Sequence, residues 1–327
     1  MSPSPWFRIL VPVYWLGFLL HHFLIFRLGL RKKAVLPTLV VGNLTVGGSG
    51  KTPMVRWLSE QLSQHRNIGI LSRGYGRTSK GIVEVLVNSL ATETGDEALE
   101  LKRALPHLPV VVSENRRKGV EWIQKHHPQV QWVLLDDGLQ HHLLQPDISI
   151  CLVSHSAFNQ KNKDLLPAGR WRQPFRTRTQ FDVLFLTKCP PNMDCPSDWD
   201  ACFLEEMGPA VDLRTGNQIN PEAPGILLTG LADNQSLRLA FPGWEPYTLP
   251  DHGHMNTKEI EALERRAAGR YILTTGKDLA RLGPAAATLS RLALVPLRLS
   301  VLRPSASELT QKIMQHVDRI ERSRQLS

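Results

Sequence analysis

Short apolar runs alternate with amphipathic stretches along most of the chain. Runs of about four to eight residues rich in Val, Ile and Leu are typical of buried parallel strands, and the stretches between them repeat apolar positions at helical spacing. This alternation predicts an α/β fold with a doubly wound sheet, whose ligand lies at the carboxyl ends of the strands. We expect strands at 37–43, 67–72, 108–113, 131–136, 147–154, 181–187, 225–230, 271–278 and 292–301, and helices near 51–66, 96–105, 114–127, 257–268 and 306–323.

The start of the chain breaks this alternation. Residues 9–26 read ILVPVYWLGFLLHHFLIF and contain no Asp, Glu, Lys or Arg. A helix of this length is about 27 Å long, slightly shorter than a bilayer's hydrocarbon core. Pro12 and the two histidines weaken a simple spanning helix, whereas the flanking aromatic residues suit a membrane interface. We expect a membrane anchor that spans the bilayer or lies in its interface; a buried core helix and a cleaved signal peptide are the alternatives.

Positive charge accompanies this apolar leader. The chain of 327 residues has a net charge of +9, and seven Lys or Arg residues precede Glu60, its first acidic residue. The basic cluster at 27–33 directly follows the apolar run, and by the positive-inside tendency it is expected to hold the rest of the chain on the cytoplasmic side. A nucleic-acid-binding arm would not need so many apolar residues, so no nucleic acid partner is expected. The four cysteines match no zinc spacing and are expected to be thiols.

A glycine-rich segment follows the first expected strand. It reads GNLTVGGSGKTP (42–53), close to the P-loop pattern G-x-x-x-x-G-K-[ST], although Thr45 replaces the first glycine. In such loops backbone N–H groups surround phosphate oxygens, the lysine reaches the terminal phosphates, and the final hydroxyl binds Mg²⁺. The predicted nucleotide-binding residues are Thr45, Val46, Gly47, Gly48, Ser49, Gly50, Lys51 and Thr52.

A second element of nucleotide-binding sites appears further along the chain. The segment QWVLLDDGLQHH (131–142) is an apolar strand that ends in Asp136 and Asp137, as in a Walker B pattern. Such a carboxylate lies against the Mg²⁺ that accompanies the nucleotide. We therefore expect Thr52, Asp136 and Asp137 on the metal side of a site for a nucleotide with Mg²⁺.

Several further motifs occur in a fixed order with these two. The chain resembles the tetraacyldisaccharide 4′-kinases (lipid A 4′-kinases), and the resemblance extends from residue 42 to residue 278. The family's loop also tends to carry Ser or Thr at the position of Thr45. The motifs that carry the resemblance are GNLTVGGSGKTP, SRGYGR (72–77), GDEA (95–98), VVVSENR (110–116), DDGLQHH (136–142), LLPAGRWRQP (165–174), LTGLA (228–232), PDHGHM (250–255) and TTGKD (274–278).

The resemblance implies a reaction and a location. Members of the family transfer the γ-phosphate of ATP, with Mg²⁺, to the 4′-hydroxyl of tetraacyldisaccharide 1-phosphate, which forms lipid IVA in lipid A biosynthesis. They act at the cytoplasmic face of the inner membrane, and their fold has two α/β/α domains joined by a two-stranded hinge. The expected partners are therefore the acylated glucosamine disaccharide and the inner membrane surface.

Roles for individual residues also follow from the resemblance. Lys51 and Asp137 are expected to be catalytic, and Asp96 and His252 are expected to form a pair that takes the proton from the sugar hydroxyl. From the sequence alone, Asp96 could instead only cap a helix, His252 could lie in solvent, and His254 is a rival for its role. The expected contacts to anionic oxygens of nucleotide or lipid are Arg73, Arg116 and Arg172.

Two positions depart from the family pattern. The family usually has Glu where this chain has Gln173 and Gly276. If the usual carboxylates bind metal or stabilise the hinge, those roles are lost here. Neither departure touches the phosphate loop or the pair Asp136–Asp137.

The pattern and the resemblance together suggest a division of the chain. Residues 1–33 form the membrane-associating leader, 34–155 the P-loop kinase domain, and 156–303 a smaller α/β domain that closes over the substrate. The C-terminal helix, 304–327, is expected to pack back on the kinase domain.

Two other functions stay open from the residues alone. One is a P-loop kinase that acts on another substrate, and the other is a nucleotide-hydrolysing switch protein. TKCP (187–190) and TTGKD faintly resemble guanine-reading Lys-x-x-Asp or Lys-x-Asp motifs. Neither is well placed after the strands of the P-loop domain, which argues against the switch.

Overall fold

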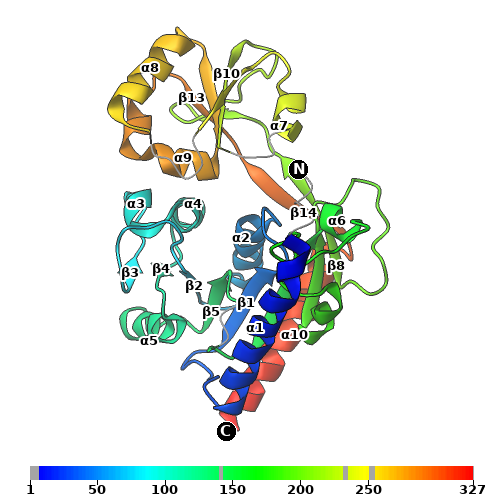
Figure 1. The fold of residues 1–327 in the computed structure, drawn as a ribbon. Coiled ribbons are helices and arrows are strands. Elements are labelled where there is room, and N and C mark those ends of the chain that lie inside the picture. Colours follow the sequence, from blue (N-terminus) through cyan, green and yellow to red (C-terminus); the bar gives the residue numbers. More distant parts are fainter. Residues whose placement is uncertain (1–6, 140–142, 231–234, 250–254, 327) are drawn as a thin grey trace. The chain divides into compact units, whose positions relative to one another are not determined.

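The chain folds into two compact units, each assembled from separate segments (Figure 1). The computed structural model describes residues 7–139, 143–230, 235–249 and 255–326. The first unit comprises 1–73, 113–205 and 299–327, and the second comprises 74–112 and 206–298. These segments differ from the continuous ranges 34–155 and 156–303 expected from the sequence. An alternation of strands and helices does not reveal where the chain leaves one unit and later returns to it.

A sheet with β1 near its middle forms the core of the first unit. Its strand order in this unit is β14-β8-β7-β6-β1-β5-β2, and β1 pairs in parallel with both β5 and β6. All residues of β1, β5 and β6 are buried, as expected for central strands covered on both faces. The strands are β1 (Thr38–Asn43), β2 (Ile68–Ser72), β5 (Trp132–Asp136), β6 (Ile148–Ser154), β7 (Val183–Thr187), β8 (Ala201–Met207) and β14 (Leu297–Arg303).

Helices flank this sheet. The C-terminal α10 begins with a capping box in which Ser305 and Glu308 satisfy each other's backbone N–H groups. Near its other end, Glu321 accepts hydrogen bonds from Arg66 at 2.9 Å and from the Trp132 indole at 2.8 Å, so α10 is fixed to the first unit. The helices of this unit are α1 (Phe7–Arg27), α2 (Lys51–Leu62), α5 (Arg116–His126), α6 (His155–Phe158), η1 (Phe175–Gln180) and α10 (Ala306–Gln325).

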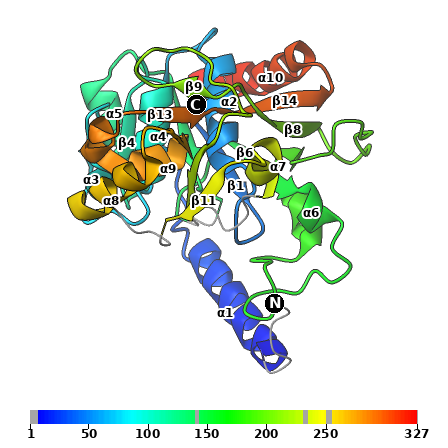
Figure 2. The same cartoon turned by 90° about the horizontal axis from the view of Figure 1, so that it is seen from above.

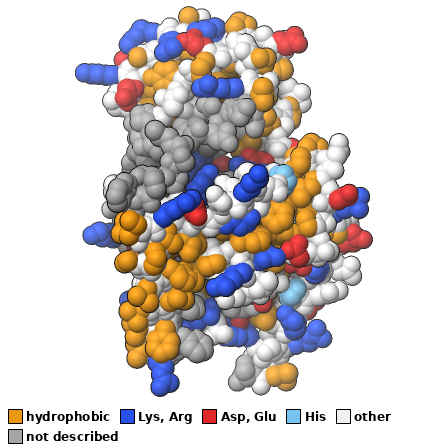
Figure 3. All heavy atoms as spheres, turned by 45° about the vertical axis from the view of Figure 1, so that its right-hand side comes forward, with side chains coloured by type: hydrophobic (Ala, Val, Ile, Leu, Met, Phe, Trp, Pro, Cys, Tyr) orange, Lys and Arg blue, Asp and Glu red, His pale blue; other side chains and the backbone are white. Residues whose placement is uncertain are grey.

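The leader helix α1 extends away from the sheet of the first unit (Figure 2). Apolar side chains on several of its faces are exposed, including Val13 at 67% and Leu16 at 68%, and they form a hydrophobic column in Figure 3. By length and composition, α1 could cross a membrane. Polar contacts hold it beside a distant loop, since Arg8 pairs with Asp164 at 3.2 Å and the Tyr14 hydroxyl donates to a carbonyl at 3.0 Å.

The second unit contains a smaller sheet with the strand order β11-β10-β12-β13-β9. Its strands are parallel except β9, and α8 begins with a capping box between Asn256 and Glu259. The remaining elements are β3 (Val83–Glu84), α3 (Ala91–Thr94), α4 (Asp96–Ala104), β4 (Val110–Val112), β9 (Val211–Asp212), β10 (Gly225–Thr229), α7 (Gln235–Ala240), β11 (Glu245–Thr248), α8 (Thr257–Ala267), β12 (Tyr271–Thr275), α9 (Gly276–Leu282), η2 (Gly283–Thr288) and β13 (Leu292–Val295).

The predicted α/β class with a doubly wound sheet is confirmed. Two expected strands end differently in the structure. The run 292–301 is divided at Pro296, which lacks the N–H that a continuous strand would need, into β13 and β14 of different sheets. The run 271–278 ends at Thr275, whose hydroxyl caps α9 by accepting from the Asp278 N–H.

One cysteine pair corrects the expectation of four thiols. Cys195 and Cys202 are joined by a disulfide, whereas Cys151 and Cys189 are free and buried. The start of β8 brings Cys202 back beside the preceding loop, with a Cα–Cα distance of 5.6 Å. The sequence alone did not show that this loop returns on itself.

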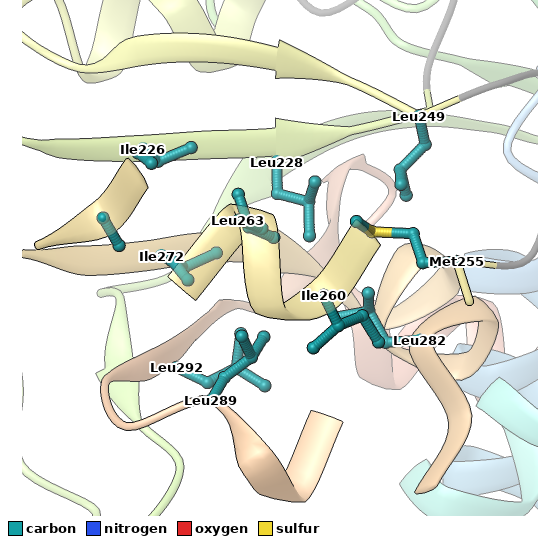
Figure 4. Packing of buried hydrophobic residues seen from close by; sticks show 11 residues of the cluster. Ile226, Leu228, Leu249, Met255, Ile260, Leu263, Ile272, Leu282, Leu289 and Leu292 are labelled. Carbon is teal, nitrogen blue, oxygen red and sulfur yellow. The ribbon is translucent and has the colours of Figure 1, made fainter. Parts of the chain in front are cut away.

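The core of the second unit generates a stability prediction. The Leu263 side chain, on α8, is 0% exposed and packs among Leu228, Ile260 and Ile272 (Figure 4). We expect Leu263→Ala to lower the free energy of unfolding by about 2–5 kcal/mol, because it leaves a cavity in a packed core. Urea denaturation followed by circular dichroism measures this change. Leu239→Ala, at a position 74% exposed, is the matched control, and equal midpoints for the two variants would contradict the packing described.

Candidate active site

The predicted phosphate loop joins β1 to α2 in the first unit. Asn43, the last residue of β1, donates to Ser49 Oγ at 2.7 Å and accepts from Lys51 Nζ at 3.4 Å. Gly50 has a φ of 79°, which glycine adopts without steric cost, and α2 begins at the next residue. The loop therefore leads into a helix N-terminus, where backbone N–H groups attract anions.

Thr45 lies in a short antiparallel pairing with a distant segment. It bridges Trp171, the Val46 N–H donates to the Arg170 carbonyl at 2.7 Å, and the Arg172 N–H donates to the Leu44 carbonyl at 2.7 Å. A β-branched residue suits this extended backbone. The replacement of the usual glycine is thus explained, because the start of the loop is a strand edge rather than a tight turn.

Arg170 covers the glycine-rich part of the loop. Its Nε donates to the Val46 carbonyl at 3.1 Å, and a Cβ placed on Gly47 would lie only 2.0 Å from its Nη2. Gly47 also has a φ of 107°, so its backbone conformation favours glycine, and any side chain there would displace the Arg170 guanidinium. The sequence analysis did not single out Arg170, because its contact with the loop depends on the strand pairing at Trp171.

The two aspartates lie at the end of β5, beside β1. Asp136 is 1% exposed and accepts a hydrogen bond from the Ser72 hydroxyl at 3.1 Å. Asp137 has a φ of 50°, which is unusual for a residue other than glycine and is typical of functional sites. Its Oδ1 lies 3.5 Å from Lys51 Nζ and 3.8 Å from Arg172 Nη1. The structure therefore brings together three residues that lie far apart in the sequence.

Arg116 lies behind these carboxylates and is 1% exposed. It donates to the Ser113 carbonyl at 2.7 Å and to the Asp136 carbonyl at 3.2 Å. Burial lowers the pKa of Arg116 to about 10, and the charges of Asp136 and Asp137 oppose that decrease. These contacts fix the backbone at the end of β5.

The expected acid–base pair belongs to the second unit. Asp96 begins α4, and its Oδ2 lies 3.1 Å from Arg281 Nε, while Arg281 also pairs with the buried Asp278 at 3.3 Å. His252 and His254 lie outside the described residues. Arg73 is exposed and directly follows β2, at the end of the first segment of the first unit.

The carboxyl group of Glu100, a half-buried residue, occupies the space next to Gly276. A Cβ on Gly276 would lie 2.8 Å from Glu100 Oε1, so the glycine allows α4 and α9 to approach closely. Burial raises the pKa of Glu100 to about 8, and the nearby Glu97 adds to the rise, while Lys277 opposes it. Lys277 itself pairs with Glu97 at 2.9 Å. The departure from Glu at position 276 was the only sequence signal for this arrangement.

Gln173, the other departure from the family pattern, is buried beside the loop that carries Trp171. Its Oε1 accepts a hydrogen bond from the Thr177 hydroxyl at 3.4 Å. The neutral side chain of Gln173 therefore forms this hydrogen bond within its own segment.

The strand–loop–helix of β1 and α2, with the aspartates of β5, defines the first unit as a P-loop nucleotide-binding fold. A profile of the tetraacyldisaccharide-1-P 4′-kinase family, LpxK, matches residues 5–318. The chain belongs to this family. The predictions of the family, of the enzyme class, and of phosphate transfer from ATP to the 4′-hydroxyl that forms lipid IVA are confirmed.

Individual relatives agree with this assignment. The tetraacyldisaccharide 4′-kinase of Porphyromonas gingivalis ATCC 33277 is 28% identical over 320 residues, which cover 85% of this chain and 86% of that protein. That of Flavobacterium johnsoniae is 31% identical over 266 residues, covering 76% and 78%. The crystal structure of LpxK from Aquifex aeolicus in complex with ATP superposes with a TM-score of 0.74 at 28% identity, covering 94% of this chain and 98% of that one.

The raised pKa of Glu100 generates a prediction about pH. Between pH 4.5 and about 8 the folded state holds this proton more tightly than the unfolded chain, so stability is lost as pH rises through this window. We expect Glu100→Gln, which cannot ionise, to be more stable than the parent protein at pH 8.5, on the order of a few kcal/mol, because one pKa unit corresponds to about 1.4 kcal/mol.

Thermal unfolding at pH 5 and at pH 8.5 measures this difference. The melting temperature of the parent protein is expected to fall more between the two values than that of Glu100→Gln. Glu261→Gln, at an exposed position of α8, is the control for loss of a carboxylate. A Glu100→Gln profile parallel to that of the parent protein would contradict the assigned ionisation.

Proposed function

We propose that phosphate transfer takes place at the loop 45–52, with Lys51 and Asp137 beside the reacting phosphate. The observation that carries this proposal is the distance of 3.5 Å between Lys51 Nζ and Asp137 Oδ1, at the ends of neighbouring parallel strands. Phosphoryl transfer depends mainly on position and on cations around the γ-phosphate. Lys51, with the N–H groups at the start of α2, supplies positive charge where the terminal phosphates lie.

The residues around Asp137 also fit a magnesium ion. Asp137 Oδ1 is buried and faces two cationic side chains, and no hydrogen bond to it is found among the residues that the structure describes. Carboxylate and hydroxyl oxygens suit Mg²⁺, which keeps waters and phosphate oxygens as its other ligands. We therefore assign the metal to Thr52, Asp136 and Asp137. When bound, Mg²⁺ neutralises charge on the β- and γ-phosphates.

The proton acceptor that we propose is the pair Asp96–His252. A carboxylate beside an imidazole favours the form that accepts a proton from the sugar hydroxyl. In the described part of the pair, Arg281 holds Asp96 at the start of α4. Asp96 would thereby be held in place to orient the imidazole.

The three predicted arginines take different roles in this proposal. Arg172 is close enough to Asp137 to meet a phosphate bound at Lys51. Arg116, which is buried and bonded to two carbonyl groups, positions the aspartates. Arg73 is exposed and stays a candidate contact for the anionic lipid.

We further propose that α1 attaches the protein to the cytoplasmic side of the inner membrane, where its acylated substrate lies. Exposed apolar side chains on an isolated helix would be costly in water and are stabilised in a bilayer. The basic residues 27–33 follow the helix and would meet anionic headgroups. The smaller unit would close over the substrate during transfer.

We expect Lys51→Ala and Asp137→Asn each to lower kcat roughly a hundredfold or more, because each removes a charge that acts on the transferring phosphate. The assay follows the transfer of radiolabelled γ-phosphate from ATP to tetraacyldisaccharide 1-phosphate in detergent. Lys312→Ala, which breaks an exposed ion pair with Asp200, is the matched control. Undiminished transfer by folded Lys51→Ala protein would contradict the proposed site.

The membrane proposal is tested with substitutions that leave the polar contacts of α1 intact. We expect the double variant Val13→Asp and Leu16→Asp to lose binding to vesicles that contain anionic lipid by more than tenfold, because each aspartate near the middle of a helix in a bilayer costs about 2.5–3.5 kcal/mol. Leu239→Asp, at an equally exposed position, is the control. Sedimentation with the vesicles measures binding, and equal binding by all three proteins would exclude α1 as the anchor.

A further inference from the structure

Lys188 and Glu205 form an ion pair on the phosphate loop that the proposed transfer does not use. Lys188 follows β7 in the motif TKCP, and Glu205 lies on β8. From the sequence, this motif was weighed only as a guanine-reading one. The sheet order β8-β7-β6-β1 adds its location, because β7 runs parallel to β6 and ends at the same edge as β1.

Both side chains reach the loop itself. Lys188 Nζ lies 3.9 Å from the position of a Cβ on Gly48, and Glu205 Oε2 lies 3.9 Å from that of a Cβ on Gly50. The two groups are 3.6 Å apart. The Thr187 hydroxyl donates to the Ser49 carbonyl at 2.8 Å, which fixes the end of β7 against the loop.

The backbone of Lys188 is also unusual. Its φ is 56°, a left-handed conformation shared with Asp137 and with few other described residues that are not glycine. Such conformations persist where surrounding contacts impose them, often at ligand sites. Lys188 and Asp137 thus turn their side chains toward the same loop from strands on opposite sides of β1.

This arrangement indicates which end of a nucleotide each side would meet. At the proposed transfer site, the γ-phosphate faces the side of β5, where Lys51 and Asp137 lie. A nucleotide bound in this direction would extend its ribose and base across β1, toward β6, β7 and β8. Lys188 and Glu205 are the charged pair on that side of the loop for which contacts with both Gly48 and Gly50 are described.

We propose that Glu205 and Lys188 read the base of the nucleotide and select adenine over guanine. The Lys188 stem lies along the nucleotide, and the Glu205 carboxylate accepts a hydrogen bond from the exocyclic amino group of adenine. Guanine has a carbonyl oxygen at the corresponding position, which a carboxylate repels. Pro190 and Pro191 stand where a Lys-x-Asp or Lys-x-x-Asp motif would place its guanine-reading aspartate.

The partial burial of this pair makes such a selection effective. The side chain of Glu205 is 22% exposed and that of Lys188 is 40% exposed. When the group opposite a carboxylate is also an acceptor, the loss of binding free energy is larger for a carboxylate shielded from water than for an exposed one. Solvent cannot replace the missing hydrogen bond at the shielded site. The inference rests on the binding of ATP at the loop, but it concerns a different part of the nucleotide from the transfer step.

The test compares ATP and GTP as phosphate donors for the full-length protein in detergent. We expect Glu205→Gln to lower kcat/KM for ATP roughly tenfold and to raise that for GTP, because the glutamine amide can donate to the guanine carbonyl. The ratio of the two values is expected to fall by roughly a hundredfold. Glu60→Gln, which breaks an ion pair with Arg56 on α2, is the matched control and is expected to leave the ratio unchanged.

Calorimetric binding of ADP and GDP separates this inference from the proposed transfer site. We expect the Glu205→Gln protein to lose its preference for ADP over GDP, and Lys188→Met to bind both more weakly while it keeps the preference. An unchanged ratio in folded Glu205→Gln protein would overturn the inference and assign the ion pair a purely structural role. Phosphate transfer to the disaccharide by the parent protein is measured in parallel. This measurement tests the proposed transfer site independently of the result for Glu205→Gln.

Discussion

The antiparallel pairing of residues 44–46 with 170–172 is the contact on which the rest of the site depends. Two backbone hydrogen bonds of 2.7 Å fix the start of the phosphate loop to a segment more than a hundred residues away. The same segment places Arg170 over Gly47 and Arg172 beside Asp137. The buried Trp171 anchors it in a hydrophobic cluster, so that these arginines are held by the core rather than by solvent-exposed turns.

The same segment also connects the site to the leader helix. The Arg172 carbonyl accepts a hydrogen bond from the Tyr14 hydroxyl. Asp164, which precedes this segment in the chain, pairs with Arg8. A helix with exposed apolar side chains is therefore attached to the residues that face the phosphate loop. Within the first unit, the helix that we propose as the membrane anchor and the phosphate loop that we propose as the transfer site share one support, which would suit an enzyme whose acceptor carries acyl chains.

Much of this site could be predicted because its residues follow one another in short segments. A glycine-rich loop between a strand and a helix, and two aspartates after an apolar strand, have local patterns with a physical reason. Arg170 and Lys188 could not be found in this way. Their meaning depends on which strands are neighbours, and the parallel order of β1, β5, β6 and β7 leaves no local mark in the sequence. Likewise, nothing local in the run 292–301, which was expected to be one strand, shows that its two parts on either side of Pro296 join different sheets.

Gly276 shows how a departure in sequence can be compensated in space. Read along the chain, the change from Glu to Gly removes a carboxylate from the motif TTGKD. In the folded second unit, Glu100 from α4 fills the space that the missing side chain leaves, 2.8 Å from where a Cβ would lie. Its raised pKa follows from this position, because the carboxyl group is buried near Glu97 and Asp96 as well as Lys277. A carboxyl group is thus still present beside α9, although it now comes from another helix and is protonated at neutral pH.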